Sequence, residues 1–137
     1  MTNLYALQGA GSSGKSDVII RLLELLRSKY PKAIYRELHR GRDIKVVIEN
    51  IKGKTIGIES QGDPNSRLLS SLEIFKAEKC NIIFCSCRTS GMTVDWVNTL
   101  SPPYKITFVQ KLYASGSKGK FAANAQQAYD LIGLAGL

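Results

Sequence analysis

The chain has 137 residues, of which 44% are hydrophobic and 22% are charged, and its formal net charge is +8. This length suits one domain and leaves little room for a separate substrate domain, so we expect residues 1–137 to form a single domain. No apolar run approaches the ~20 residues of a membrane helix and no signal peptide is evident, which predicts a cytoplasmic protein with no membrane partner. The basic balance favours anionic partners, either nucleic acid or phosphorylated small molecules.

The first predicted elements are a short buried strand over residues 3–8 and a helix over residues 14–29, which ends before Pro31. Between them, residues 9–16 read Gly-Ala-Gly-Ser-Ser-Gly-Lys-Ser and match G-x-x-x-x-G-K-[ST] at every fixed position. Glycines allow successive backbone N–H groups to curl around an anion, and the following helix adds the positive end of its dipole. The sequence therefore predicts a phosphate-binding loop.

This motif, at a strand-to-helix junction, resembles the Walker A motif of the P-loop NTPase superfamily. The resemblance is strong over about the first thirty residues and points to no single subfamily. It implies a three-layer α/β sandwich that binds a nucleoside triphosphate with Mg²⁺. Lys15 would then reach the β- and γ-phosphates, and the Ser16 hydroxyl would bind the metal ion. The residues expected to bind the nucleotide are Gly9, Gly11, Ser12, Ser13, Gly14, Lys15, Ser16, Asp17 and Gly62.

The next segments predict a change in sheet direction. A strand over residues 33–38 leads into a basic segment. Two β-type runs follow over residues 44–50 and 55–59, separated by a short turn that contains Gly53, and they predict an antiparallel hairpin. We therefore expect an α/β fold with a mostly parallel sheet and one antiparallel hairpin. If the phosphoryl acceptor is a small molecule, the basic side chains that would bind it are Arg36, His39, Arg40 and Arg42.

The hairpin ends in Glu59-Ser60-Gln61-Gly62. Small GTPases have Asp-x-x-Gly at the corresponding place, where the carboxylate binds Mg²⁺ through water and the glycine N–H approaches the γ-phosphate. The resemblance implies that Glu59 lies on the metal side with Ser16. Alternatively, Glu59 only ends the hairpin and Asp63 caps a helix over residues 65–79. Gln61 or Asp63 could orient an attacking water, and the sequence does not choose between them.

Residues 81–87 form the clearest buried strand, and the three cysteines lie in or beside it. Because no C-x-x-C spacing is present, we expect them to be buried, reduced and free of metal. The strand ends in Arg88 where many P-loop NTPases have the acidic Walker B residue, so the acidic role falls to Glu59. Arg88 is a candidate for stabilising charge on the transferred phosphoryl group, and an ordinary surface role is the alternative.

The C-terminal third predicts a short helix over residues 93–100 with Trp96 in the core, a strand over residues 104–109 and a helix over residues 121–133. Residues 110–120 form a basic loop. In adenylate-kinase-like proteins the equivalent connection lies over the base, so we expect it to contact adenine or ribose; the alternatives are a solvated loop and a docking site for nucleic-acid phosphates. The Asn-Lys-x-Asp motif with which small GTPases read guanine is absent after the 81–87 strand, which favours ATP.

These features together predict an ATP-binding P-loop NTPase that transfers the γ-phosphoryl group with Mg²⁺, with ATP hydrolysis as the favoured reaction. A small-molecule kinase is one alternative. A module whose nucleotide occupancy switches its binding to nucleic acid or protein is another. The expected catalytic residues are Lys15, Glu59 and Arg88, and the expected metal-binding residues are Ser16 and Glu59.

Overall fold

The computed structural model of the protein describes residues 2–39 and 41–137, so Arg40 of the predicted basic segment lies outside the described residues. Strands and helices alternate along most of the chain. In chain order the elements are β1 (Thr2–Gln8), α1 (Lys15–Lys29), β2 (Ile34–His39), β3 (Lys45–Ile51), β4 (Lys54–Glu59), α2 (Leu68–Ala77), β5 (Ile82–Cys87), α3 (Met92–Asn98), β6 (Tyr104–Gln110) and α4 (Gly116–Leu134).

The strands form one mixed sheet in the order β2-β3-β4-β5-β1-β6. β1 pairs in parallel with β5 and β6, and β4 pairs in parallel with β5. The predicted hairpin of β3 and β4 is confirmed, and β2 is also antiparallel to β3. The antiparallel part is therefore larger than one hairpin, because the connection from β2 to β3 is too short for the crossover that parallel pairing requires.

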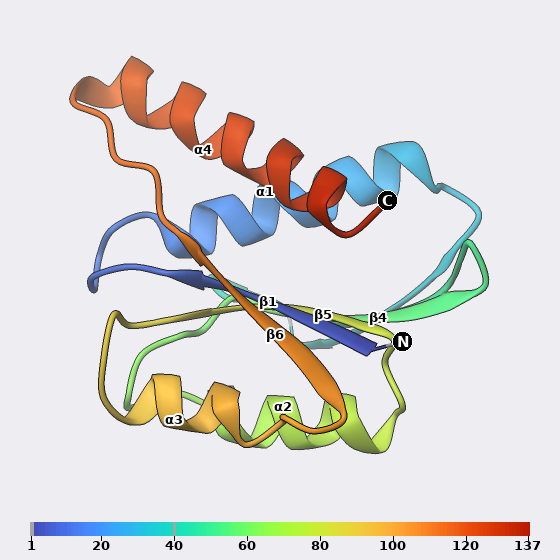
Figure 1. Cartoon of the computed structure of the whole chain (residues 1–137). Coiled ribbons are helices and arrows are strands. Elements are labelled where there is room, and N and C mark those ends of the chain that lie inside the picture. Colours follow the sequence, from blue (N-terminus) through green and yellow to red (C-terminus); the bar gives the residue numbers. More distant parts are fainter. Residues whose placement is uncertain (1, 40) are drawn as a thin grey trace.

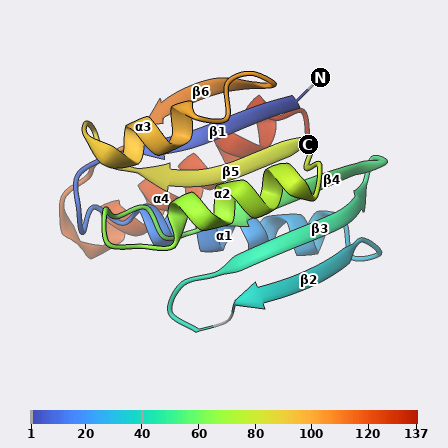
Figure 2. The same cartoon turned by 90° about the horizontal axis from the view of Figure 1, so that it is seen from below.

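Helices cover both faces of the sheet, as the α/β prediction requires (Figures 1 and 2). Helices α1 and α4 pack on one face, and α2 and α3 pack on the other. Side chains that alternate along β4 supply both cores: Ile56 and Ile58 pack on the α1 side, whereas Gly57 lies against Phe75 of α2. This alternation decides which side chains of β4 can reach α1.

The candidate site lies at one edge of the sheet. β1, β4 and β5 run parallel, so their carboxyl ends meet at this edge, together with the start of the reversed strand β3. The segment of residues 9–16, called here the 9–16 loop, follows β1 at this edge. β5 lies between β1 and β4 in the sheet, so the end of β4 is two strand spacings, or about 10 Å, from the end of β1.

Two predicted helix starts are wrong. α2 begins at Leu68 and not near residue 65, and Asp63 does not cap it. Instead the Gln61 side-chain oxygen accepts a hydrogen bond from the Arg67 backbone N–H (3.1 Å) just before the helix. α4 begins at Gly116, so the last five residues of the predicted 110–120 loop are helical.

Other predictions about the core agree with the structure. Cys80, Cys85 and Cys87 are free and buried. Burial raises the pKa of the Cys87 thiol to about 11 and that of Cys80 to about 12. Trp96 is partly buried against the α2 side of the core. Of the helices in the described ranges, none has the length and apolarity needed to cross a membrane.

Candidate functional site

The 9–16 loop holds the Lys15 side chain in a buried position. Lys15 is 6% exposed, and its ammonium donates to the carbonyls of Gly9 (2.9 Å) and Ala10 (2.8 Å). Burial is the largest influence on this group and lowers the pKa of Lys15, while nearby Asp63 acts in the opposite direction. An anion above the loop could replace the two carbonyls as the partner of this cation.

The three glycines of the motif serve two different purposes. Gly14 has a φ of +89°, which is the left-handed conformation that favours glycine. Gly9 and Gly11 permit close approach instead. A Cβ on Gly9 would lie 2.9 Å from the Cβ of Lys111, and a Cβ on Gly11 would lie 2.7 Å from the Arg88 guanidinium. The motif therefore lets the segments after β5 and β6 pack directly on the loop.

A polar cavity of about 530 Å³ opens on the side of the loop that faces residues 42–43 and 60–66. Every lining residue is either polar or glycine, which suits a strongly hydrated, charged ligand. The lining residues are Ser12, Ser13, Gly14, Lys15, Ser16, Arg42, Asp43, Ser60, Gln61, Gly62, Asp63, Asn65, Ser66 and Ser86.

Three oxygen-bearing groups meet at the start of α1. The Ser16 hydroxyl lies 3.1 Å from the Asp43 carboxylate and 3.3 Å from the Ser60 carbonyl, and the Ser60 hydroxyl donates to the same Asp43 carboxylate at 2.9 Å. Two hydrogen bonds between Ser60 and Ile44 hold the two segments together. The Ile44 N–H donates to the Ser60 hydroxyl (2.8 Å), and the Ser60 N–H donates to the Ile44 carbonyl (3.0 Å). Sequence reasoning did not select Asp43, because 27 residues separate it from Ser16.

Glu59 does not join this group. Its side chain is fully buried on the α2 side, where its carboxylate accepts from Arg67 Nε (2.7 Å), Arg67 Nη2 (3.0 Å), the Ser71 hydroxyl (2.6 Å) and the Gln61 N–H (3.0 Å). Four donors leave this carboxylate well satisfied within the fold. The reason is strand alternation, which directs residue 59 away from α1 and residue 60 toward it. Asp43 occupies the place next to Ser16 that the spacing had suggested for Glu59.

Arg88 lies over the 9–16 loop and is paired with Asp63 (Nε to Oδ1, 3.0 Å). Both side chains are partly exposed, at 39% and 61%, so the pair can open at little cost. The Arg88 N–H donates to the Thr93 hydroxyl at 2.9 Å, which fixes the backbone at the end of β5.

Gln61 and Asp63, the two candidates for orienting a water, lie in different surroundings. The Gln61 side chain accepts a hydrogen bond at the start of α2, whereas the Asp63 carboxylate is exposed and lines the cavity. Of these two, Asp63 has the more exposed side chain, and its carboxylate can reach a ligand once its ion pair with Arg88 opens.

A second cavity of about 390 Å³ lies on the other side of the loop and is partly apolar. Leu112, Tyr113 and Ala114 line one wall, and Lys120 and Asn124 of α4 line another. The Tyr113 hydroxyl accepts from the Ala10 N–H (3.2 Å), which attaches this wall to the loop. The sequence had placed a base-contacting segment here, and the residues following β6 do lie beside the loop.

The remaining predicted residues divide into two groups. Gly62 lines the polar cavity, where a Cβ would lie only 2.5 Å from the Ser86 carbonyl, so glycine is required by close packing. Arg42 also lines this cavity. In contrast, Asp17 binds Arg21 (2.8 Å) and Asn124 (2.9 Å) and lines neither of these two cavities, and Arg36 forms ion pairs with Glu49 and Glu78.

Sequence reasoning also missed residues outside the motif. Ser60 and Asn124 contact the first turn of α1 from distant parts of the chain, and nothing in their local sequence marks them. Comparisons of the chain with protein-family models, with curated proteins and with solved structures find no match.

Proposed function

We propose that the protein binds a nucleoside triphosphate, with ATP favoured, and transfers its γ-phosphoryl group to water. The observation that carries this proposal is that residues 12–14 line both cavities. A ligand lying across the loop would place a polyphosphate on the polar side and a base in the partly apolar cavity. Such division between charged and apolar surroundings is what a nucleotide requires.

The group of Ser16, Asp43 and the Ser60 carbonyl fits Mg²⁺, which prefers hard oxygen ligands and commonly retains substrate phosphates and waters in its shell. Ser16 and Asp43 would hold the ion. When bound, Mg²⁺ would supply positive charge that offsets the charge of the phosphates. The chain's own part is to keep the Asp43 carboxylate fixed beside Ser16 through the hydrogen bond from Ser60.

Replacing Asp43 tests this assignment. Asp43→Asn keeps the size of the side chain and removes its charge, so the concentration of Mg²⁺ giving half-maximal turnover should rise at least tenfold. The measurement is phosphate release as a function of free Mg²⁺. The exposed Asp95→Asn of α3 serves as the matched control and should leave the Mg²⁺ dependence unchanged. Equal Mg²⁺ dependence in the two variants would remove Asp43 from the metal site.

Positioning and charge stabilisation account for most of phosphoryl-transfer catalysis, and the described residues can supply both. Lys15 would exchange its two carbonyl partners for phosphate oxygens. Arg88 would leave Asp63 and turn toward the transferred group, since its guanidinium already lies against Gly11. The released Asp63 carboxylate would then accept a hydrogen bond from the attacking water and orient it.

Asp63→Asn separates turnover from binding. Without the carboxylate the attacking water loses its acceptor, and we expect phosphate release to fall about 100-fold, the lower range for a lost general base. Nucleotide affinity, measured by titration with a fluorescent analogue, should not fall, because Asp63 carries the same sign of charge as the phosphates and its neutralisation removes a repulsion. If turnover persists in Asp63→Asn while affinity is retained, Asp63 has no role in the chemical step.

Thermal-shift measurements test the proposal as a whole. ATP, GTP and their diphosphates are each added with and without Mg²⁺, and a tighter ligand should raise the melting temperature more. The proposal expects the largest shift with ATP and Mg²⁺. If none of the four nucleotides shifts the transition at millimolar concentration, the protein does not bind nucleotides in this site.

A small-molecule kinase is the second candidate, and the size of the polar cavity favours it. Arg42 and Asn65 line this cavity but are not part of the 9–16 loop or the Asp43 group, so they could hold a polar acceptor. Phosphate release in the absence of any acceptor identifies the hydrolase. Nucleotide consumption that appears only after addition of a metabolite mixture identifies the kinase.

A further inference from the structure

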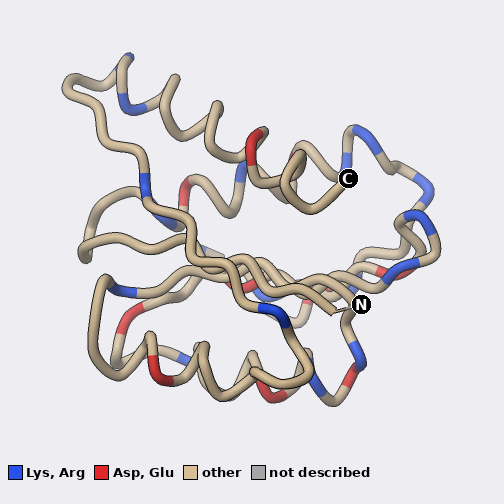
Figure 3. The backbone as a smooth tube through the Cα atoms, in the orientation of Figure 1, with Lys and Arg blue, Asp and Glu red and all other residues tan. Residues whose placement is uncertain are grey.

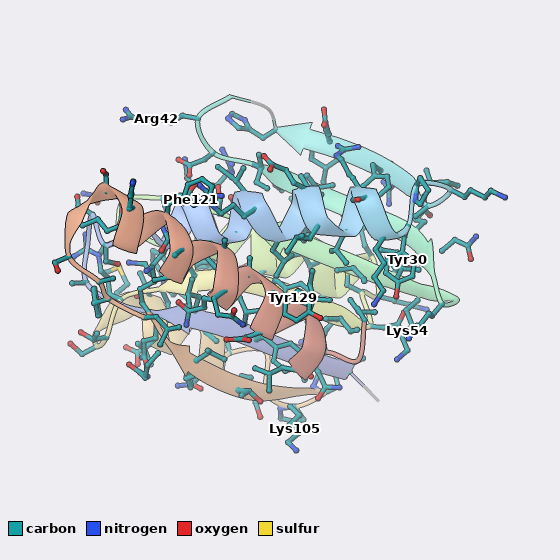
Figure 4. All side chains as sticks on the ribbon, turned by 90° about the horizontal axis from the view of Figure 1, so that it is seen from above. Tyr30, Arg42, Lys54, Lys105, Phe121 and Tyr129 are labelled. Atoms are coloured by element: carbon teal, nitrogen blue, oxygen red, sulfur yellow. The ribbon has the colours of Figure 1, made fainter. Side chains whose placement is uncertain are left out.

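Seven exposed lysines lie at the end of the molecule opposite the candidate site. They come from the end of α1, the turn between β3 and β4, the end of α2 and the start of β6, and we call this surface the lysine end. Its members are Lys29, Lys32, Lys52, Lys54, Lys76, Lys79 and Lys105. In Figure 4, Lys54 lies at one end of the molecule and Arg42 of the polar cavity at the other.

Contacts between the segments place four of these lysines, Lys29, Lys52, Lys54 and Lys79, on neighbouring parts of one surface. The Lys29 ammonium donates to the Leu137 carbonyl and Lys52 donates to the adjacent Gly136 carbonyl (3.1 Å). Next to Lys54, the Thr55 N–H donates to the side chain of Asn81 (2.8 Å), which lies two residues after Lys79. Figure 3 shows Lys and Arg gathered where α1 continues into β2 and where β3 turns into β4.

The lysine end carries a local excess of positive charge. Among the described residues, none of its seven lysines forms an ion pair with a carboxylate. The acidic residues Glu49 and Glu78 are both paired with Arg36. Together with Arg36 and its two carboxylate partners, the seven lysines sum to +6, compared with a net charge of +8 for the whole chain. Lys29 and Lys76 lie in the last turns of α1 and α2, where a cation stabilises the helix dipole. This stabilisation explains the presence of only two of the seven lysines.

We propose that the lysine end binds the phosphate backbone of double-stranded nucleic acid. The sheet has six strands, so its edge is about 24 Å long, a length over which a duplex presents roughly 14 phosphates. Lysines without a carboxylate partner suit this ligand because each one releases condensed counterions from a densely charged polyanion. A protein partner fits less well, since protein interfaces are depleted in lysine and enriched in aromatic residues and arginine.

The proposal predicts sequence-independent and strongly salt-dependent binding, and it does not rest on the proposed nucleotide chemistry. The probe is a fluorescein-labelled DNA duplex of about 20 base pairs, titrated by anisotropy without nucleotide at several salt concentrations. The test variant is Lys54→Gln/Lys76→Gln, whose two sites are exposed and lie in different layers. The control is Lys118→Glu at the start of α4, which changes the net charge by the same two units and lines neither cavity of the candidate site.

The double variant should bind the duplex at least tenfold more weakly at low salt, and the slope of log affinity against log salt should fall by about 2. The control should keep the wild-type slope. Three results would overturn the proposal: no duplex binding by the wild type at about 50 mM salt, equal weakening in both variants, or binding only to vesicles that contain phosphatidylserine. Circular dichroism melts of both variants confirm that the fold is intact.

Discussion

Replacement of Lys15 by alanine is expected to weaken nucleotide binding by about a hundredfold or more. The bound phosphate would lose two charge-assisted hydrogen bonds from the buried ammonium, each contributing about 1.5–3 kcal/mol. Affinity is measured by titration of a fluorescent triphosphate analogue, with Mg²⁺ held constant.

Lys76→Ala provides the control, since it removes an exposed lysine far from the loop and should leave affinity unchanged. The pH dependence supplies a second readout. Burial lowers the pKa of Lys15 below the ordinary lysine value of 10.5. The wild-type affinity should therefore fall as the pH rises, and the fall should begin at a lower pH than an ordinary lysine would give. The variant should lack this step. If Lys15→Ala binds nucleotide as tightly as the wild type, the 9–16 loop does not bind phosphate.

Replacement of Glu59 by glutamine is expected to lower the free energy of unfolding by about 3 kcal/mol or more. Glu59 is fully buried, and its carboxylate satisfies both Arg67 nitrogens and the Ser71 hydroxyl. Glutamine would present an NH₂ group to these donors and leave the guanidinium without its counter-charge, which typically costs about 3–5 kcal/mol for a buried pair. Urea denaturation followed by circular dichroism gives the measurement.

A matched control distinguishes burial from charge alone. Glu49→Gln also removes one carboxylate from an arginine, but Glu49 is 43% exposed and should change stability by less than 1 kcal/mol. The same variants discriminate between the two roles considered for Glu59. Unchanged stability together with a lost Mg²⁺ dependence would return Glu59 to the metal site and contradict the structural role.

The sequence predicted the elements that local patterns encode. The strand and helix around residues 9–16, the hairpin of β3 and β4 and the buried strand β5 were all placed correctly, because hydrophobic periodicity and turn residues are local properties. The start of α2 was misplaced. Asp63 and Pro64 form a good local cap, but the pairing of Arg67 with Glu59 and of Asp63 with Arg88 holds this segment out of the helix.

The candidate site was predicted only where its residues are contiguous. The 9–16 loop is one stretch of chain, so its spacing was sufficient to single out Lys15 and Ser16. The acidic partner was assigned to Glu59 by a four-residue pattern, which does not say which face of a strand a side chain occupies. A shift of one position along β4 moves a side chain to the other face, and only the packing of α1 and α2 fixes that choice.

By itself the sequence determined that a glycine-rich loop with a lysine joins the first strand to the first helix. Only the tertiary structure decided which distant groups surround this loop: Asp43 and Ser60 at Ser16, Arg88 at Gly11, and Tyr113 at Ala10. The reason is that strand order and direction bring these groups together across 27 to 103 residues of chain. Pairing over such separations depends on the whole sheet, and no local spacing records it.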